Sequence, residues 1–140
     1  MSVTVRLAAP ADLPAVFALR HEVFVVGQDV PADLERDEHD AGCDHAVATS
    51  GGAVVGTGRL LGDGTIGRMA VAADERGRGT GALVLARLEQ RAVERGLASV
   101  ELHAQVHALG FYERAGYAPL GEPYLEAGIA HVSMRKHLDA

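Results

Sequence analysis

A glycine-rich turn between two regular segments is the part of the sequence best suited to bind a ligand. It reads Arg76-Gly77-Arg78-Gly79-Thr80-Gly81, follows an expected strand at Thr65–Val71 and opens an expected helix at Thr80–Arg95. Glycine has no Cβ, so the backbone can approach a ligand closely and adopt positive φ angles. The free N–H groups at a helix N-terminus attract anions, and two arginines add positive charge. The turn therefore predicts an anion site, most plausibly for a pyrophosphate.

Two other phosphate-binding loops can be compared with this turn. A P-loop needs a lysine after its second glycine, and the chain has no lysine before Lys136, which excludes that loop. The dinucleotide pattern G-x-G-x-x-G/A is met by the glycines of the turn with Ala82, and Glu101 lies near the distance expected for a ribose-binding acid. However, Ala72–Glu75 separates the strand from the glycines, and fewer than sixty residues follow the turn. An NAD(P)-binding oxidoreductase stays open as the alternative.

A second segment, Gln105–Tyr117, completes a pattern with the first. Met69–Gly81 resembles the acetyl-CoA signature of the GNAT superfamily of N-acetyltransferases, whose [Q/R]-x-x-G-x-[G/A] turn falls on Arg76, Gly79 and Gly81. Gln105–Tyr117 resembles the second motif of that family, N-x-x-A-x-x-F-Y-x-x-x-G-F, with glutamine in place of asparagine. The two motifs lie on consecutive strand–helix units, as they do in the family.

Further matches extend the resemblance over nearly the whole chain. Leu19-Arg20 and Val23–Val26 near the start, and Gly128–Met134 near the end, resemble the ElaA-like subgroup of GNAT proteins. One departure is Gly27, which stands where that subgroup usually carries glutamate. If that glutamate binds the acceptor, this chain has a different or enlarged acceptor pocket.

The resemblance implies how acetyl-CoA would bind. In the family a bulge in the strand before the glycine turn frees main-chain groups for the pantetheine arm, and neighbouring strands splay apart there. Carried onto this sequence, the expected coenzyme-binding residues are Met69, Ala70, Val71, Arg76, Gly77, Arg78, Gly79, Thr80, Gly81, Gln105, His107 and Phe111.

Tyr112 matches the family's general acid, which protonates the leaving thiolate of the coenzyme. The pKa of a phenol, about 10, is close enough to that of a thiol for this role. A packed helix tyrosine is the competing interpretation, but Phe111 is expected to provide the buried anchor of this helix. Neither motif contains a cysteine, so direct attack by the amine is simpler than a covalent acyl-enzyme.

The attacking amine arrives as an ammonium ion and must lose a proton. Glu101 and His103 share one face of an expected strand at Ser99–Ala104, and His131 lies on the last strand. We rank them in that order as the proton acceptor. The acceptor-binding residues expected from the resemblance are Phe24, Gln28 and His131.

Hydrophobic periodicity and turn residues predict the elements that position these groups. A first strand over Val3–Leu7 precedes a helix from Leu13 to Val26, which Gly27 is expected to end. The remaining elements are expected as a loop over 29–44, a hairpin of 45–49 and 53–61, a strand over 65–71, a helix over 80–95, a strand over 99–104, a helix over 107–114, turns at Pro119 and Pro123, and a strand over 129–135. This order predicts an α/β (α+β mixed) domain whose mixed sheet of about six or seven strands is flanked by helices on both faces. It is the acyl-CoA N-acyltransferase fold that the resemblance implies.

Length, composition and charge limit the other possibilities. The 140 residues fit one domain, 1–140, and 48% apolar residues fit a folded core. The net charge of −6 leaves no basic face for nucleic acid, and no apolar run exceeds five residues, which excludes a transmembrane helix. A single cysteine, Cys43, and the lack of a signal-like N-terminus fit the cytoplasm. A homodimer is compatible with the family but has no signal of its own.

Seven acids and one base lie between Asp29 and Asp44. The segment is most simply a solvated acidic loop, and an amine-binding role is the functional alternative. Its Asp, Glu, His and Cys residues match no zinc or EF-hand spacing, so no metal is expected. The sequence thus favours an acetyl-CoA-dependent N-acetyltransferase acting on an unidentified amine, and a non-catalytic coenzyme-A-binding module remains the second alternative.

Overall fold

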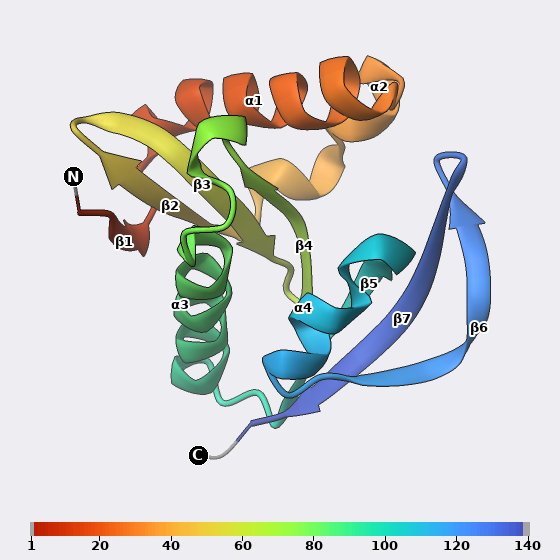
Figure 1. Cartoon of the computed structure of the whole chain (residues 1–140). Coiled ribbons are helices and arrows are strands. Elements are labelled where there is room, and N and C mark those ends of the chain that lie inside the picture. Colours follow the sequence, from red (N-terminus) through yellow and green to blue (C-terminus); the bar gives the residue numbers. More distant parts are fainter. Residues whose placement is uncertain (1, 139–140) are drawn as a thin grey trace.

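A computed structural model describes residues 2–138 and contains one seven-stranded sheet (Figure 1). Its strands are β1 (Thr4–Leu7), β2 (Asp44–Ser50), β3 (Ala53–Leu60), β4 (Thr65–Val71), β5 (Ser99–Gln105), β6 (Ala118–Glu126) and β7 (Ile129–His137). They lie in the order β1-β2-β3-β4-β5-β7-β6. Neighbours are antiparallel except β4 and β5, which are parallel. The predicted mixed sheet is therefore confirmed.

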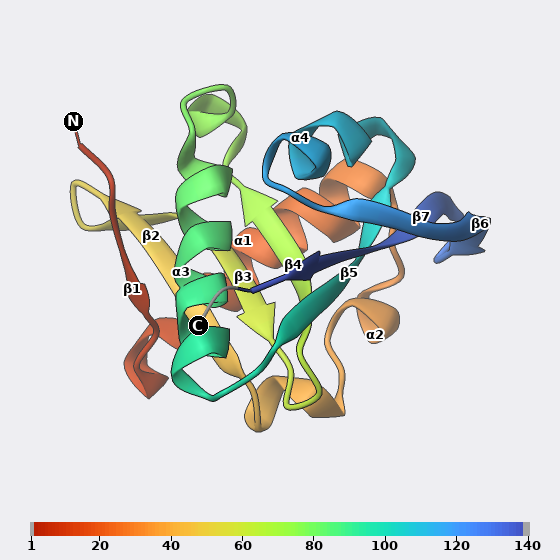
Figure 2. The same cartoon turned by 90° about the horizontal axis from the view of Figure 1, so that it is seen from below.

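Helices cover both faces of this sheet. They are α1 (Leu13–Arg20), α2 (Ala32–Glu35), α3 (Thr80–Glu94) and α4 (Leu109–Arg114). Figure 2 shows α1 and α3 on opposite faces of the central strands. Figure 1 shows the β6–β7 hairpin apart from β1–β4, with its tip on the side of α2; β7 pairs with β5. Among residues 2–138, no helix has both the length and the apolar character needed to cross a membrane.

The main core lies between α3 and the sheet. Val84, Leu85 and Leu88 of α3 are at most 1% exposed and pack over alternate residues of the inner strands. Two glycines of β3 permit this approach: a Cβ on Gly58 would lie 2.9 Å from Leu88 Cδ1, and one on Gly56 would lie 2.9 Å from Thr80 Cγ2. These distances are too short for a side chain, so glycine at both positions fixes how closely α3 packs on β3.

The central strands separate at the place where the family resemblance implied a bulge. On β3 and β4 the register passes from Arg59–Gly67 to Thr57–Ala70, so β4 holds one extra residue. Arg68 lies in that bulge with a φ of 50°, which is uncommon for a residue other than glycine. β4 and β5 pair only near Thr65 and Ile66 and then diverge. The predicted bulge and splay are thus confirmed.

Local signals located α3 and the first hairpin correctly. Gly79 caps the N-terminus of α3 with a φ of 84°, and Gly96 follows its end with a φ of 77°. Gly51 and Gly52 form the β2–β3 turn, with φ angles of 58° and 82°. At each of these positions the backbone angle is one that glycine adopts without strain.

Three predictions about the irregular segments were wrong. Gly27 does not end the first helix: its φ is −82°, and residues 21–26 before it form a π-helical turn. The segment 29–44 contains α2 and a 3-10 turn at Glu38–Ala41, where a continuous loop was expected. Pro119 and Pro123 do not form turns, because both lie inside β6. β6 is an edge strand, where a missing N–H donor costs no ladder hydrogen bond.

Candidate active site

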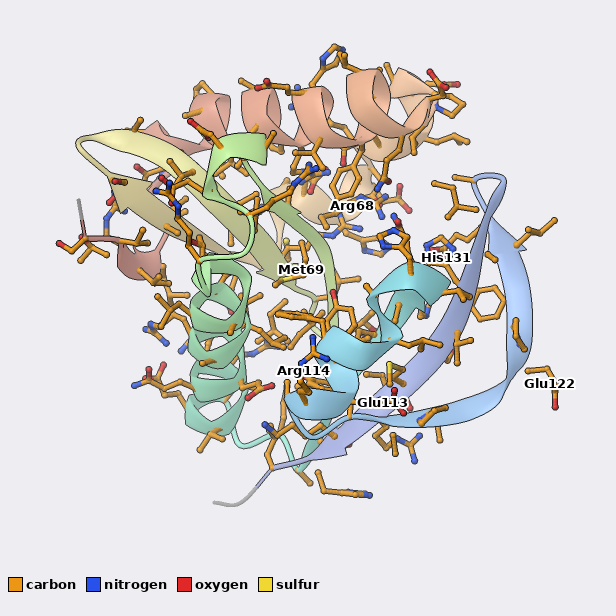
Figure 3. The ribbon with its side chains drawn as sticks, in the orientation of Figure 1. Arg68, Met69, Glu113, Arg114, Glu122 and His131 are labelled. Carbon is orange, nitrogen blue, oxygen red and sulfur yellow. The ribbon has the colours of Figure 1, made fainter. Side chains whose placement is uncertain are left out.

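A cleft of about 610 Å³ opens where β4 and β5 diverge. It is lined by the bulge of β4, the second half of β5 with the helical segment that follows it, the π-helical turn and the β6–β7 hairpin. Ten of the predicted site residues reach this cleft: Phe24, Gln28, Met69, Ala70, Val71, His103, Gln105, His107, Tyr112 and His131. Figure 3 shows Arg68 and Met69 on the β4 side and His131 on the β7 side. Residues more than a hundred positions apart in the sequence thus border one space.

A second hollow of about 570 Å³ lies at the glycine-rich turn. Arg76, Gly77, Gly79, Thr80, Gly81 and Phe111, all predicted to bind coenzyme, are among its lining residues. Met69, Val71, Ala108 and Tyr112 line both hollows. The two spaces are therefore joined along β4 and α4, and a ligand seated on the turn can extend into the cleft.

The turn has the geometry of an anion site at a helix N-terminus. Gly79 is followed by the 15 residues of α3, whose first N–H groups have no partner within the helix. The Thr80 Oγ1 is buried and has no hydrogen-bond partner among residues 2–138. The Arg76 Nε donates to the main-chain oxygen of Val71, 3.2 Å away, which holds this arginine beside the turn. Arg78 is 66% exposed and lies outside both linings, 3.7 Å from Glu75.

Phe111 and Gly81 face each other beside the turn. A Cβ on Gly81 would lie 3.4 Å from the Phe111 Cζ, so glycine leaves room for the ring. The ring of Phe111 contacts Tyr112 edge-on, with centroids 5.0 Å apart.

Tyr112, and not Phe111, is the more buried member of the aromatic pair. Its side chain is 9% exposed, whereas Phe111 is only partly buried, which reverses the sequence-based expectation that Phe111 is the anchor. Burial raises the pKa of Tyr112 to about 12. The hydroxyl therefore keeps its proton at neutral pH, as a proton donor must.

The two expected proton acceptors on β5 lie in different surroundings. Glu101 accepts hydrogen bonds from Arg135 of β7 and does not line the cleft. His103 lines the cleft, and its Nδ1 donates to the Glu126 Oε1 across 3.0 Å. The structure thus brings His103 to the cleft and leaves Glu101 in an ion pair outside it.

His131 joins the same group from β7. It is 6% exposed, its Nδ1 donates to the Ile129 main-chain oxygen at 2.6 Å, and its Nε2 lies 3.6 Å from the Glu126 Oε2. Glu126, at the end of β6, therefore lies between two imidazoles. Sequence reasoning missed Glu126 because it treated this stretch as irregular. The signal available was Ala127-Gly128, a two-residue turn with φ angles of 52° and 77° that aligns β6 with β7.

Gln28 and Gln105 connect the N-terminal helical segment to β5. Each amide nitrogen donates to the other side chain's oxygen, at 3.1 and 2.9 Å. The His107 Nε2 also donates to the Gln105 Oε1, at 2.6 Å. Gln28 was expected at the acceptor and Gln105 at the coenzyme, so this pair lies where the two expected binding regions meet.

The acidic segment is largely neutralised by buried arginines. Arg20 is fully buried; its Nε lies 2.9 Å from a Glu35 oxygen and its Nη1 lies 2.7 Å from the Asp40 Oδ1. The Arg59 Nη1 donates to Asp40 at 2.9 Å and to Asp37 at 2.7 Å. Burial alone would raise the pKa of Asp40, but the hydrogen bonds from Arg20, Asp37 N–H and Arg59 outweigh it and hold that pKa well below its usual range. The expectation of a solvated acidic loop was wrong for these carboxylates.

Arg68 connects this ion-pair network to the bulge of β4. Its Nε donates to the Glu35 main-chain oxygen at 2.9 Å, and its Nη2 lies 3.3 Å from the Asp37 Oδ2. Burial, followed by the charges of Arg59 and Arg20, lowers the pKa of Arg68. An arginine nevertheless stays charged at neutral pH, so three arginines balance three carboxylates at one side of the cleft.

Asp40, Cys43 and His45 each place one potential metal ligand within 4.8 Å of the others. Most of their atoms already have other partners, although the His45 Nδ1 is buried without one among residues 2–138. The Asp40 carboxylate accepts from two arginines, and the His45 Nε2 donates to the Asp40 main-chain oxygen at 2.9 Å. Burial raises the pKa of the Cys43 thiol, which favours the protonated form that does not bind metal. This donor set does not fit a metal ion.

Comparison with known proteins places this arrangement among acetyltransferases. Residues 11–138 match the family model described as an acetyltransferase (GNAT) domain. The chain is 38% identical over 129 residues to YjcF of Bacillus subtilis, named as an N-acetyltransferase, covering 89% of this chain and 92% of that protein.

Two solved structures have the same fold over almost their full lengths. An acyl-CoA N-acyltransferase from Pseudomonas aeruginosa is 34% identical, with a TM-score of 0.84 over 96% of this chain and 99% of the other. ElaA of Escherichia coli is 28% identical, with a TM-score of 0.84 and the same coverage.

Proposed function

The chain belongs to the GNAT acetyltransferase family, and from that membership we propose that it transfers the acetyl group of acetyl-CoA to a primary amine by direct attack. Acetyl transfer by an N-acetyltransferase follows from the family. The mechanism, the residues that perform it and the nature of the acceptor are our proposal. The observation that carries it is the position of Tyr112 on the wall shared by the two hollows.

The residues around the turn suit acetyl-CoA. The N–H groups at the start of α3 would hold the pyrophosphate, and the buried Thr80 Oγ1 has a free capacity for one further hydrogen bond. Met69, beside the bulge residue Arg68, has no register partner on β3 or β5, so main-chain groups there are available to a pantetheine arm. When bound, acetyl-CoA supplies a thioester whose carbonyl carbon takes the amine and whose thiolate leaves.

Tyr112 is the general acid in this proposal. Its hydroxyl carries a proton at neutral pH, as a phenol with its ordinary pKa of about 10 already does, and burial raises that pKa further, to about 12. It gives this proton to the leaving thiolate as the new C–N bond replaces C–S. A thiolate that has just left in a poorly solvated space is a strong enough base to take it. The proton lost by the amine nitrogen restores the phenol through water.

His103 is the proton acceptor in this proposal, ahead of Glu101. His103 lines the cleft, and the hydrogen bond from its Nδ1 to Glu126 leaves the Nε2 lone pair free to take a proton. Glu101 is held in an ion pair by Arg135 and does not line the cleft, so it is not placed to take a proton from the amine. Gln28, Phe24 and His131 line the part of the cleft in which the acceptor would bind.

The experiment that tests this function combines binding and turnover. Calorimetric titrations with acetyl-CoA, CoA and NADPH should give binding of the first two and none of the third. Release of CoA in the presence of a primary amine should then fall about 10²- to 10⁴-fold in Tyr112→Phe, the usual effect of losing a general acid. Binding without turnover of any amine would support a non-catalytic coenzyme-A module, and binding of NADPH alone would support the oxidoreductase.

Tyr117→Phe is the matched control. Tyr117 is 3% exposed, its hydroxyl donates to the Glu89 Oε2 at 2.7 Å, and it does not line the cleft. Its replacement should lower the free energy of unfolding by about 1 kcal/mol and leave the turnover rate unchanged. Equal turnover in both variants would refute the acid role of Tyr112.

A further inference from the structure

Three carboxylates line the cleft, and they differ in what balances their charge. Glu35 lies 2.8 Å from Arg20, and Asp37 lies 2.7 Å from Arg59. Glu126 has no arginine or lysine within ion-pair distance among residues 2–138. The His103 imidazole donates to it, and the His131 Nε2 lies 3.6 Å away. An imidazole is charged for only part of the time at neutral pH. Among the three carboxylates that line the cleft, Glu126 is therefore the one that no arginine or lysine of the described residues neutralises, so it can bind a positively charged ligand.

The hydrogen bonds of the two histidines fix where their protons lie. The His131 Nδ1 meets the Ile129 main-chain oxygen, which can only accept, so the proton is on Nδ1 and the neutral ring leaves Nε2 bare. The His103 Nδ1 likewise donates to the carboxylate of Glu126. Each neutral imidazole thus has a lone pair on Nε2, and that of His103 has no partner in residues 2–138.

The Glu126 carboxylate still has capacity for hydrogen bonds. One oxygen accepts from His103, and the other lies 3.6 Å from the His131 Nε2. A carboxylate accepts about four hydrogen bonds in all, and this side chain is 44% exposed. An ammonium ion entering the cleft can therefore donate to Glu126 while lying next to the His103 ring.

The rest of the cleft does not suit a second positive charge. Its other charged groups are Arg59 and Arg68, together with the two carboxylates that these arginines and Arg20 already neutralise. Apolar side chains of the N-terminal segment form the opposite wall: Val23, Phe24, Val30 and Leu34. A second ammonium group would lose its hydration there and meet arginines without gaining a free carboxylate.

We propose that Glu126 binds the ammonium group of a monoamine acceptor with an apolar body, and that the adjacent His103 takes its proton. This rests on the proposed acetyltransferase function. In the step, one N–H bond of the ammonium breaks and, through a bridging water, one N–H bond forms at the His103 Nε2, whose lone pair points away from Glu126. The positive charge thus moves from the amine to the imidazole. Glu126 is in contact with both positions of that charge and stabilises it before and after the transfer. The neutral amine then has the lone pair it needs for attack.

Glu126→Gln tests the site, and Glu122→Gln is its matched control. Glu122 is on the same strand and exposed, and Figure 3 shows it pointing away from the cleft. With phenethylamine as acceptor, Glu126→Gln should raise KM about ten- to hundredfold, the range for losing a hydrogen bond to a charged group. It should lower kcat as well, because the amide orients His103 less well. Glu122→Gln should change neither constant.

Two binding measurements separate this inference from the proposed function. Acetyl-CoA should bind Glu126→Gln and the unaltered protein with the same Kd in calorimetry, and Glu126→Asp should recover part of the amine affinity. Phenethylamine titrated into the CoA-bound protein should bind, and Glu126→Gln should lose that binding. Circular dichroism melting checks that the variants are folded.

Each outcome decides between the two claims. The unaltered protein should acetylate phenethylamine and hexylamine with kcat/KM values about tenfold or more above those of putrescine and spermidine, the factor that ~1.4 kcal/mol represents. A preference for the polyamines, or equal constants in Glu126→Gln and Glu122→Gln, would overturn this inference and leave the acetyltransferase function standing. Acetyl-CoA binding without turnover of any of the four amines would overturn both.

Discussion

Asp40 is the carboxylate on which two buried arginines depend, and its replacement by asparagine is the most quantitative test of the ion-pair network. Asp40 is 7% exposed and accepts from the Arg20 Nη1 at 2.7 Å, the Arg59 Nη1 at 2.9 Å and the Asp37 N–H at 3.0 Å. Asparagine keeps the size of the side chain and one acceptor oxygen, but it removes the charge. Arg20 and Arg59 would then share two carboxylates with Arg68.

The expected loss follows from the burial of this network. Removing one partner of a buried ion pair costs about 3–5 kcal/mol, because it leaves an uncompensated charge. The total stability expected for a 140-residue domain is about 7–20 kcal/mol. Asp40→Asn should therefore remain folded and lose a large part of its stability, with a melting temperature lower by about 10–20 °C.

Urea unfolding at pH 7 and pH 3 measures this loss and its origin. The folded-state pKa of Asp40 is lowered, so its contribution is present above the unfolded-state pKa of about 3.9 and is lost as the pH falls toward the folded value. The difference between the two proteins should be full at pH 7 and smaller by about 1 kcal/mol at pH 3.

Asp44→Asn provides the control, since the substitution is the same and the surroundings differ. Asp44 is 28% exposed and lies 3.1 Å from Arg91 on α3. A partly exposed pair of this kind contributes about 0–1 kcal/mol. A loss below 1 kcal/mol in Asp40→Asn, or equal losses in the two variants, would refute the reasoning from burial.

Three further predictions follow from single positions. Gly79→Ala should weaken acetyl-CoA binding about tenfold in calorimetry, or ~1.4 kcal/mol, because a φ of 84° strains any side chain and disturbs the N–H groups of the turn. Gly58→Ala should lower the free energy of unfolding by about 1–3 kcal/mol in urea, since its Cβ would lie 2.5 Å from the Met69 Sδ. Tyr112 has a pKa of about 12 in the folded protein and about 10 in the unfolded chain, so it stabilises the fold below pH 10 and this contribution is lost as the pH rises to about 12. The free energy of unfolding should therefore fall over this pH range, and Tyr112→Phe should remove that part of the fall.

Each of these predictions has a matched comparison. Gly52 has a similar φ of 82°, and a Cβ there would meet nothing within 4 Å. Gly52→Ala should therefore lower the free energy of unfolding as much as Gly79→Ala does, without changing acetyl-CoA binding. Equal acetyl-CoA affinities in the two variants would contradict the role of the glycine-rich turn. Gly67→Ala has nothing within 4 Å of its Cβ and should cost little, and a loss equal to that of Gly58→Ala would argue against the packing explanation. Tyr117 also has a raised pKa, but it is present both in the unaltered protein and in Tyr112→Phe, so its effect cancels between them. If the free energy of unfolding depended on pH in the same way in both proteins, the pH dependence could not come from Tyr112.

Local signals in the sequence were enough to predict most regular elements. Gly79 and Gly96 mark the ends of α3, and Gly51-Gly52 marks the first hairpin, because a positive φ at a defined position is a local requirement. The prolines of β6 misled the prediction for a reason that is not local. Proline is excluded from inner strands and permitted at edges, and only the strand order makes β6 an edge.

The sequence by itself located the glycine-rich turn, because a positive φ and free N–H groups at a helix N-terminus depend on a short stretch of chain and its immediate neighbours. It pointed to Tyr112 through the resemblance of Gln105–Tyr117 to a family motif. Only the tertiary structure decided which charges are free. Between Asp29 and Asp44 the sequence has seven acids and one base, and the arginines that neutralise Asp37 and Asp40 come from α1 and β3. Glu126 reaches the cleft through the pairing of β6 with β7 and of β7 with β5. Such pairings depend on contacts between distant segments, and the energy of a charge depends on those contacts more than on its neighbours in sequence.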